Sequence, residues 1–204
     1  MHLAEAVAAR RSIRSFLDRP VPRVIIDRAV GLAVQAPAPH HSQPWRFALV
    51  ESPGEKGRLS HAMGDAWRDD LARDGVAPEK IASILGRSHA LLTTAPLLVV
   101  CCADMTRAHT YPDDRRMKAE HTLFAHSVGA ALQTFMMALA EEEVASCWIS
   151  APAFCGATVG ATLTLPERVE PHALVLVGYP SPGYEPRPRP EPDPGDYIFA
   201  GADP

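Results

Sequence analysis

The spacing of apolar residues along the chain predicts a mixture of helices and strands. Apolar side chains recur every three or four positions in Leu3–Arg10, Arg23–Gln35 and Ala119–Glu142, as in amphipathic helices. Arg46–Glu51 alternates between apolar and polar residues, whereas Leu97–Ala103 is continuously apolar, as expected of a strand buried on both faces. The remaining predicted elements are two strands and a short helix, at Val144–Ile149, His172–Val177 and Phe154–Leu163.

A further helical region follows Pro53-Gly54, and a glycine and a proline divide it in two. Gly75 should end the first helix and Pro78 should begin the second, since glycine favours the end of a helix and proline its first turn. The first of these helices carries candidate substrate-binding side chains, namely Trp67, Arg68 and Asp70. The alternative is that this tryptophan only anchors the helix among surface charges.

Composition and charge narrow the classes of partner. The chain has 204 residues, enough for one domain with a sizeable core, and its formal net charge of −4 argues against a general nucleic-acid binder. No apolar run approaches the roughly 20 residues that span a bilayer, so we expect no membrane partner. The N-terminus places its charges after its apolar residues, the reverse of a secretory signal, and we expect a cytoplasmic protein.

The cysteines predict buried thiols and no metal site. They lie in apolar surroundings without CxxC spacing, at Cys101, Cys102, Cys147 and Cys155. In a reducing cytoplasm such thiols stay unpaired. Cys147 is a candidate nucleophile by residue type, but it has no neighbour in the sequence that would lower its pKa, so core packing is favoured.

A proline-bounded polar segment, Ala36–Phe47 (APAPHHSQPWRF), has the character of a binding loop. Its prolines cannot continue a helix and hold their neighbours extended. Between them stand imidazole, hydroxyl and amide side chains without a Lys or Glu, and imidazole and amide groups can both donate and accept hydrogen bonds. A planar, heteroatom-rich ligand suits such a set. The alternative is a plain proline-rich turn between a helix and a strand.

A second segment, Arg10–Phe16 (RRSIRSF), concentrates positive charge near the N-terminus. If the segment is extended, Arg10, Ser12 and Arg14 share one side, so that two guanidinium groups and a hydroxyl can converge on one anion. The alternative is a solvated basic surface after a helix.

Two polar segments later in the chain are also more elaborate than simple connections require. Asp104–Met117 mixes aromatic, acidic and basic residues, and such loops often carry function. Residues 180–194 contain seven prolines, so the C-terminal tail should be extended rather than helical. The wide apolar stripe of the predicted helix Ala119–Glu142 suits either a buried central helix or the core of a dimer.

The order of these segments resembles the FMN-dependent nitroreductase family: an RRSxRxF segment, a helix, and then AP followed by four residues and SQPW. The resemblance implies an α+β fold, a three-layer sandwich with a central, mostly antiparallel sheet flanked by helices, and a homodimer that binds FMN. It also implies an FMN-binding domain over residues 1–180 and a proline-rich extended tail over 181–204 that packs on the partner subunit.

Carried over position by position, the resemblance implies which residues bind the flavin. Basic and hydroxyl side chains near the N-terminus and in the tail would hold its phosphate and ribityl chain, backbone amides after the strand Val144–Ile149 would approach the ring, and the SQPW loop would reach the flavin of the other subunit. The implied residues are Arg10, Arg11, Ser12, Ile13, Arg14, Ala38, His41, Gln43, Ile149, Ser150, Ala151, Arg187 and Arg189. This chain departs from the usual family pattern by having Pro39 in place of a serine and His41 in place of an asparagine.

Four segments narrow the resemblance further: APAPHHSQPWRF, MGDAWRDDLARDG, HTYPDDRRMKAE and SCWISAPAF. Together they are similar to the C-terminal reductase domain of the bifunctional coenzyme F420:L-glutamate ligase and its stand-alone relatives. That branch implies FMN-dependent reduction of dehydro-F420-0 to F420-0, and without the ligase half we expect no polyglutamylation. Candidate substrate-binding residues are Trp67, Arg68, Asp70, Tyr111, Arg115 and Arg116, and His40 or His41 is the candidate proton donor.

Other functions share the same flavin site. A general nitroreductase or ene-reductase using NAD(P)H would differ mainly in the 104–117 segment, and Arg115 and Arg116 would then only pair with surface carboxylates. A non-catalytic flavin-binding protein would keep the phosphate arginines but reduce no acceptor. No separate glycine-rich nicotinamide fingerprint is visible, so the sequence does not name the donor that reduces the flavin.

Overall fold

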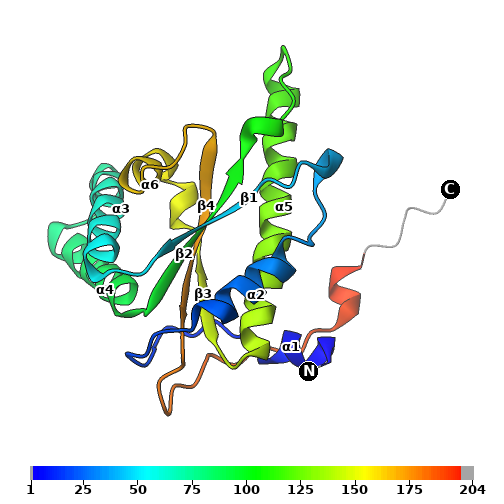
Figure 1. The fold of residues 1–204 in the computed structure, drawn as a ribbon. Helices are drawn as coiled ribbons and strands as arrows, with labels where there is room; N and C mark the ends of the chain where they lie inside the picture. The colour runs from blue at the N-terminus through cyan, green and yellow to red at the C-terminus, as the bar shows by residue number, and fades with distance from the viewer. Residues whose placement is uncertain (1, 199–204) are drawn as a thin grey trace.

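A four-stranded antiparallel sheet forms the middle layer of the protein (Figure 1). The computed structural model describes residues 2–198. The strand order is β1-β2-β4-β3, and the strands are β1 (Trp45–Val50), β2 (Leu97–Asp104), β3 (Ala145–Ile149) and β4 (Val169–Gly178). Every neighbouring pair is antiparallel.

Helices cover both faces of this sheet, which confirms the predicted three-layer α+β fold (Figure 1). On one face lie α2 (Arg23–Ala33) and the long α5 (Asp114–Glu141). On the other lie α3 (Pro53–Arg73), α4 (Pro78–Thr94) and α6 (Gly156–Thr162). The short α1 (Leu3–Ala9), at the N-terminus of the chain, packs against α5.

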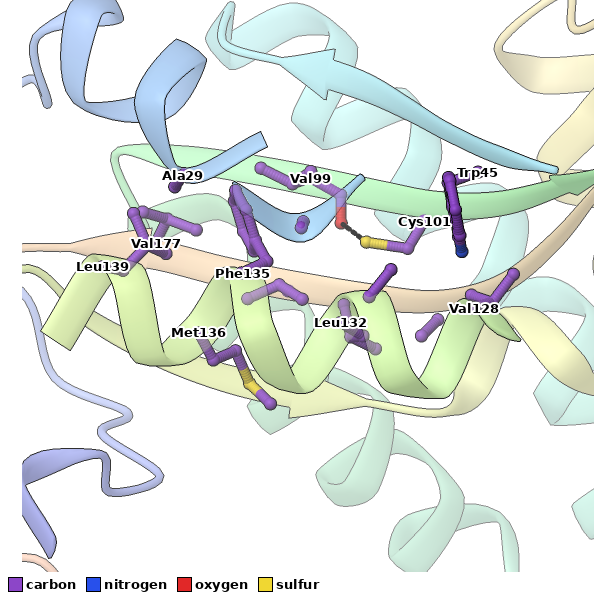
Figure 2. Close-up of a cluster of buried hydrophobic side chains, with 14 of the residues drawn as sticks. Ala29, Trp45, Val99, Cys101, Val128, Leu132, Phe135, Met136, Leu139 and Val177 are labelled. Carbon is purple, nitrogen blue, oxygen red and sulfur yellow. Dashed lines mark hydrogen bonds between the residues drawn. The ribbon is translucent and has the colours of Figure 1, made fainter. Parts of the chain in front are cut away.

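The central strands explain why Leu97–Ala103 is continuously apolar. Val99 and Cys101 of β2 belong to the core beneath α5, where Figure 2 shows them facing Leu132 and Phe135 of that helix. The alternate residues of β2, such as Leu98, belong to the second core beneath α3 and α4. Because successive side chains of a strand point to opposite faces, a strand between two helical layers must be apolar throughout.

The break between α3 and α4 follows the predicted pattern. Gly75 has a φ of 74°, in the left-handed region that glycine adopts without steric cost. The N–H of Val76 donates to the carbonyl of Leu71 at 3.0 Å, and that of Gly75 to Ala72 at 3.1 Å, which closes the end of α3. Pro78 then opens α4.

The long helix α5 begins earlier than the sequence predicted, at Asp114 rather than Ala119. Asp113 caps the helix, since its side chain accepts a hydrogen bond of 3.0 Å from the backbone N–H of Arg116. Arg115 and Arg116 therefore lie in the first turn of a helix and not in a loop. The predicted loop 104–117 is shortened accordingly and contains a 3₁₀ turn at Met105–Arg107.

By length and composition α5 is also apolar enough to cross a membrane, with a mean hydropathy of 1.4 over an 18-residue window. Half of that window is buried inside the fold, where it forms the core shown in Figure 2. A buried core helix of a water-soluble domain has this character too.

Strand β4 begins at Val169, three residues before the predicted start at His172. The pairing of β2 with β4 shifts by one residue between Cys101 and Cys102, and Pro171 stands opposite Cys102. This irregularity lets the ladder continue past the proline to Val169, which pairs with Asp104.

Candidate cofactor and substrate site

The basic N-terminal segment runs along the start of β3. Ser12 forms a parallel bridge with Ser146, and the N–H of Ile13 donates to the carbonyl of Ser146 at 3.0 Å. The Ile13 side chain is buried. Ile13 thus anchors the segment through packing and its backbone, while the Arg14 side chain stays exposed.

The proline-rich tail returns to this segment. The Arg189 guanidinium donates to the carbonyl of Arg10 at 2.9 Å and to that of Val7 at 3.3 Å, so it also caps the end of α1. Arg11 donates to the carbonyl of Arg187. Residues 179 positions apart in sequence therefore meet within one chain. Residues 199–204 of the predicted tail lie outside the described part of the chain.

These contacts gather positive charge without neutralising it. Burial, together with the neighbouring guanidinium groups of Arg189 and Arg11, lowers the pKa of Arg10. Within residues 2–198, none of the three has a carboxylate at ion-pair distance. Like charges held together at a partly buried place are offset most directly by a bound anion, and guanidinium groups bind phosphate with paired N–H donors. The cluster fits the phosphate of FMN.

The end of β3 lies beside this basic segment. Ile149 is the last residue of β3, Ser150 is exposed, and Ala151 begins a 3₁₀ turn, Ala151–Ala153. Burial raises the pKa of Cys147, and the charge of Arg14 opposes that rise. The charge of the Arg14 guanidinium therefore acts on the middle of β3. The buried, un-ionised thiol supports a packing role for Cys147.

The helix α3, which carries candidate substrate residues, packs against α6, the helix that follows β3 and the 3₁₀ turn. Asp70 contributes, after burial, to the raised pKa of Cys155, which follows the 3₁₀ turn. Asp70 also pairs with Arg73, and Arg68 pairs with Asp65. Trp67 leaves 43% of its surface exposed. Such a large exposed aromatic is available for stacking on a planar ligand.

The loop that carries His40–Gln43 is held in an unusual backbone conformation. His40, His41 and Gln43 have φ values of 52°, 52° and 48°, in the left-handed region that side chains other than glycine rarely adopt. Such residues cost of order 1–3 kcal/mol each and cluster at binding and catalytic sites. Ala38 precedes the 3₁₀ turn Pro39–His41 and packs against the main core. The strain supports a binding loop over a plain turn.

The segment after β2 packs against this loop. The rings of His40 and His109 lie 4.8 Å apart between centroids. The N–H of His109 donates to the carboxylate of Glu120 at 2.9 Å, and Glu120 is only 3% exposed. Arg107 donates to the carbonyl of His41 at 3.3 Å. Neither Arg107 nor Glu120 was selected from the sequence. Arg107 comes close to the loop because the end of β2 pairs with the start of β1, and Glu120 comes close because the first turns of α5 pack against His109.

The candidate substrate residues of the 104–117 segment are engaged to different extents. Arg116 pairs with Asp113 at 2.5 Å, and its guanidinium lies 5.2 Å from the centre of the Tyr111 ring. This contact is the surface pairing that the sequence left open as the alternative for Arg116. Arg115 is exposed and has no ion-pair partner within residues 2–198.

The two halves of the predicted flavin site lie at opposite ends of α5 in one chain (Figure 1). The histidine loop lies near Glu120 of α5, because His40 contacts His109 and His109 bonds to Glu120. The arginine cluster lies beside β3, which follows the C-terminal end of α5 at Glu141. At a rise of about 1.5 Å per residue, these levels are about 30 Å apart along the helix. The histidine loop therefore cannot complete the phosphate site of its own chain.

The sequence places the protein in a known family. The sequence model of the nitroreductase family matches residues 7–179, so the chain belongs to the nitroreductase family. Its members include oxidoreductases, and this assignment agrees with the fold and with the basic cluster. The finer likeness to the F420 reductase branch is taken up below.

Curated relatives are distant in sequence. The chain is 27% identical over 191 residues to iodotyrosine deiodinase 1 of Rattus norvegicus, covering 88% of this chain and 62% of the relative. It is 28% identical over 187 residues to iodotyrosine deiodinase of Haliscomenobacter hydrossis, covering 85% of this chain and 77% of the relative. The chain thus spans less than two thirds of the rat protein.

Solved structures share the fold. A BluB-like flavoprotein from Clostridium difficile 630 matches with a TM-score of 0.78 at 19% identity, covering 100% of both chains. A nitroreductase from Desulfovibrio desulfuricans, solved in complex with FMN, matches with a TM-score of 0.72 at 17% identity, covering 100% of this chain and 99% of the other. At these identities the likeness establishes the fold alone.

Proposed function

We propose that this member of the nitroreductase family is an FMN-dependent reductase that acts as a homodimer on a small-molecule acceptor. The observation that carries the proposal is the cluster of Arg10, Arg11 and Arg189, which has no carboxylate partner within the described chain. Bound FMN would supply hydride transfer from a reduced donor to the acceptor. The remaining steps depend on residues of this chain.

The basic cluster holds the phosphate in this proposal. The Ser12 hydroxyl and the Arg14 guanidinium, in the same segment beside β3, would add further donors to the phosphate. Backbone amides at Ser150 and Ala151 would then face the ring edge and favour negative charge there, since fixed dipoles need no reorganisation when charge develops. Trp67 and Asp70 lie on α3, which packs against α6 after the end of β3, and would limit access to the acceptor.

A homodimer would bring the histidine loop of one subunit to the flavin of the other, which a single chain cannot do. The histidine loop stands about 30 Å along α5 from its own phosphate cluster, so only a second subunit can bring such a loop to the flavin. The exposed side of α5 offers a contact surface, because Leu123 there is 44% exposed although it lies on the main apolar helix. In this arrangement the tail from residue 181 onward would also reach the partner, while Arg187 and Arg189 keep their contacts with the basic segment of their own chain.

His40 or His41 donates the proton that accompanies the hydride. Imidazole is the side chain best suited to proton transfer near neutral pH. The ring contact of His40 with His109, whose backbone is fixed by the buried Glu120, holds the loop in place. Reduction then balances: the hydride adds to one carbon of the acceptor double bond and the imidazole proton to the other.

The proposed acceptor is dehydro-F420-0, whose enol-type double bond would be reduced to give F420-0. The four sequence segments shared with the F420 reductase branch support this choice, and the unpaired, exposed Arg115 offers a cation for an anionic acceptor. A general nitroreductase or ene-reductase using NAD(P)H is the second candidate. It is supported by the family assignment and by solved neighbours such as the Desulfovibrio desulfuricans nitroreductase.

One experiment separates these candidates from each other and from a non-catalytic flavin-binding protein. The purified protein is loaded with FMN and incubated with a flavin reductant and either dehydro-F420-0 or a small nitroaromatic, and the products are identified by mass spectrometry. Conversion of dehydro-F420-0 at the higher kcat/KM supports the F420 assignment, and preference for the nitroaromatic supports the general reductase. A protein that takes up no FMN would overturn the proposal as a whole.

A further inference from the structure

A small polar cavity lies where the end of β2 meets the start of β1. Its volume is about 200 Å³, and it is lined by Ser42, Gln43, Arg46, Asp104, Thr106 and Arg107. The antiparallel pairing of Trp45 with Ala103 creates this juxtaposition, and the N–H of Asp104 donates to the carbonyl of Pro44 at 2.7 Å. Since a water molecule takes up about 30 Å³ of liquid, the cavity has room for a small polar group with some water.

One wall of the cavity carries a buried hydroxyl that has no partner. Ser42 is 6% exposed, and its Oγ is fully buried without a hydrogen bond. A buried polar atom left unpaired destabilises the fold, so such atoms are rare and need an explanation. A ligand that accepts a hydrogen bond from this hydroxyl would supply the missing partner.

Arg107 adds an uncompensated positive charge to the lining of the cavity. Arg107 donates to the carbonyl of His41 at 3.3 Å and has no ion-pair partner among the residues of the structure. A guanidinium group has five N–H donors, so most of its capacity is left for another acceptor.

The carboxylate in the cavity is already committed. Oδ2 of Asp104 accepts from Arg46 at 2.5 Å, and its Oδ1 accepts from the N–H of Thr106 at 3.0 Å. These contacts lower the pKa of Asp104, so the carboxylate stays ionised and cancels the charge of Arg46. The remaining charge of the cavity is therefore the positive charge of Arg107. Within residues 2–198, no group of acidic, histidine and cysteine side chains could hold a metal ion.

We propose that this cavity binds a small oxyanion, namely a carboxylate or phosphoryl group, between the Ser42 hydroxyl and the Arg107 guanidinium. The lining offers hydroxyl, guanidinium and amide donors, and its one carboxylate is satisfied from within the protein. Charge-assisted hydrogen bonds from Arg to planar or tetrahedral oxyanions are among the strongest in proteins. The site is separate from the basic cluster at Arg10, which lies near the other end of α5.

Occupancy of the cavity also bears on the strained histidine loop. Arg107 donates to the carbonyl of His41, Arg46 donates to that of Gln43 at 3.2 Å, and Ser42 lies between these residues. An anion bridging Ser42 and Arg107 would therefore hold the loop in its left-handed conformation. If the proposed function holds, this loop is the part of each subunit that reaches the partner's flavin, and the anion is then a group of the acceptor.

Binding of inorganic phosphate is the direct test. Isothermal titration is run on FMN-saturated protein, in which the Arg10 cluster is occupied, at an ionic strength kept constant with NaCl. We expect saturable binding whose Kd rises at least fivefold in Arg107→Ala and in Ser42→Ala. Arg87→Ala is the matched control, because Arg87 is exposed on α4, away from the cavity lining, and donates to Ser83; the Kd of this variant should equal that of the wild type.

The Ser42 variant separates a binding role from a structural one. In phosphate-free buffer, Ser42→Ala should raise the midpoint of thermal unfolding, because it removes an unpartnered buried hydroxyl. In phosphate it should lose the further rise that the wild type shows. An unchanged Kd in both Ser42→Ala and Arg107→Ala, or no saturable phosphate binding to the wild type, would overturn the proposal.

Two further experiments identify the source of the anion and separate phosphate binding in the cavity from binding at the flavin site. Competition of phosphate with dehydro-F420-0 but not with a neutral nitroaromatic, lost in Arg107→Ala, shows that the site takes a group of the acceptor. Binding without competition shows a site for a free anion. Should the protein take up no FMN, phosphate binding that persists in the double variant Arg10→Ala/Arg189→Ala would still support the cavity, whereas its loss there would place the anion at the basic cluster.

Discussion

The indole Nε1–H of Trp45 donates a hydrogen bond of 2.9 Å to the backbone carbonyl of Ser127, in the middle of α5. Trp45 is the last residue of the SQPW segment and the first of β1, so this bond ties the strained histidine loop to the longest helix of the fold. The indole is buried in the core that Figure 2 shows. The tryptophan of the motif is therefore an anchor for the loop, and the polar side chains before it are left free for ligands.

Replacing Trp45 by Phe should destabilise the protein and loosen the loop. A net loss of about 0.5–1.5 kcal/mol is expected for the hydrogen bond, with a further cost for the volume that the smaller ring leaves empty. Urea unfolding measures the change. Trp67→Phe is the control, since Trp67 is 43% exposed; there the change should stay within about 0.5 kcal/mol. Equal effects of the two substitutions would contradict the anchoring role.

Removing a guanidinium from the basic cluster should weaken FMN more than riboflavin. Hydrogen bonds to charged groups contribute about 1.5–3 kcal/mol each, so Arg10→Ala should raise the Kd of FMN by roughly tenfold to a hundredfold. Riboflavin lacks the phosphate, and its Kd should change little. Quenching of flavin fluorescence on titration measures both. A similar rise for both ligands would mean that Arg10 holds the segment in place and not the phosphate.

The proposed dimer can be tested on the exposed side of α5. Leu123→Glu places a charge on this surface, where burial in an interface would be costly, and should shift the protein toward monomers that retain less FMN. Sedimentation velocity with absorbance at a flavin wavelength reports both quantities. Leu17→Glu is the matched control: Leu17 is similarly exposed but lies on the N-terminal segment, where it pairs with Tyr179. A Leu123→Glu dimer with full FMN would refute this interface.

His172 should make stability depend on pH in the weakly acidic range. Burial lowers its pKa, despite the attraction of Glu170 and with help from the repulsion of His121, and its buried Nε2 has no hydrogen-bond partner. The unfolded chain, with an ordinary histidine pKa of about 6.5, then binds the proton more readily than the folded chain. The free energy of unfolding should therefore fall as the pH drops through about 6.5 and be unaffected by this group above it.

The corresponding variant is His172→Gln, which cannot take up the proton. Urea unfolding at a series of pH values between 5 and 8 should show a flatter profile for this variant than for the wild type. Profiles of the same slope would show that another group is responsible for the dependence.

The sequence predicted those features that depend on local pattern. The continuous apolar run Leu97–Ala103 became a strand between two helical layers, and Gly75 and Pro78 mark the ends of α3 and α4 as expected. The start of α5 was missed because Asp113–Met117 is so polar that it has the composition of a loop. The helix is capped by the hydrogen bond from the N–H of Arg116 to the side chain of Asp113, and the polarity of the segment alone does not predict this bond.

The candidate site was only partly predictable for a similar reason. The Arg10–Arg14 segment is recognisable in sequence, and its meeting with Arg187 and Arg189 followed from the family resemblance. The support of the histidine loop by Arg107 comes instead from the antiparallel register of β1 and β2, which sets the end of one strand beside the start of the other. Glu120 comes from α5, where it accepts the N–H of His109. Contacts between separate segments are not encoded in local periodicity, so these residues could not be selected beforehand.

The two arginines at the start of α5 should differ in their effect on the acceptor. Arg116 is already paired with Asp113 and lies over Tyr111, whereas Arg115 is exposed without such a partner. If they read an anionic acceptor, Arg115→Ala should lower kcat/KM for dehydro-F420-0 by roughly tenfold to a hundredfold, as loss of a charge-assisted contact of about 1.5–3 kcal/mol predicts. Arg116→Ala should lower this kcat/KM by less, because the charge of Arg116 is already partly offset by Asp113 in the free protein.

Reduction of a neutral nitroaromatic should be unchanged in both variants. Equal losses on the two acceptors would show that the substitutions disturb the fold or the flavin, and no loss on either would leave the turn Asp114–Met117 as a structural start of the helix alone.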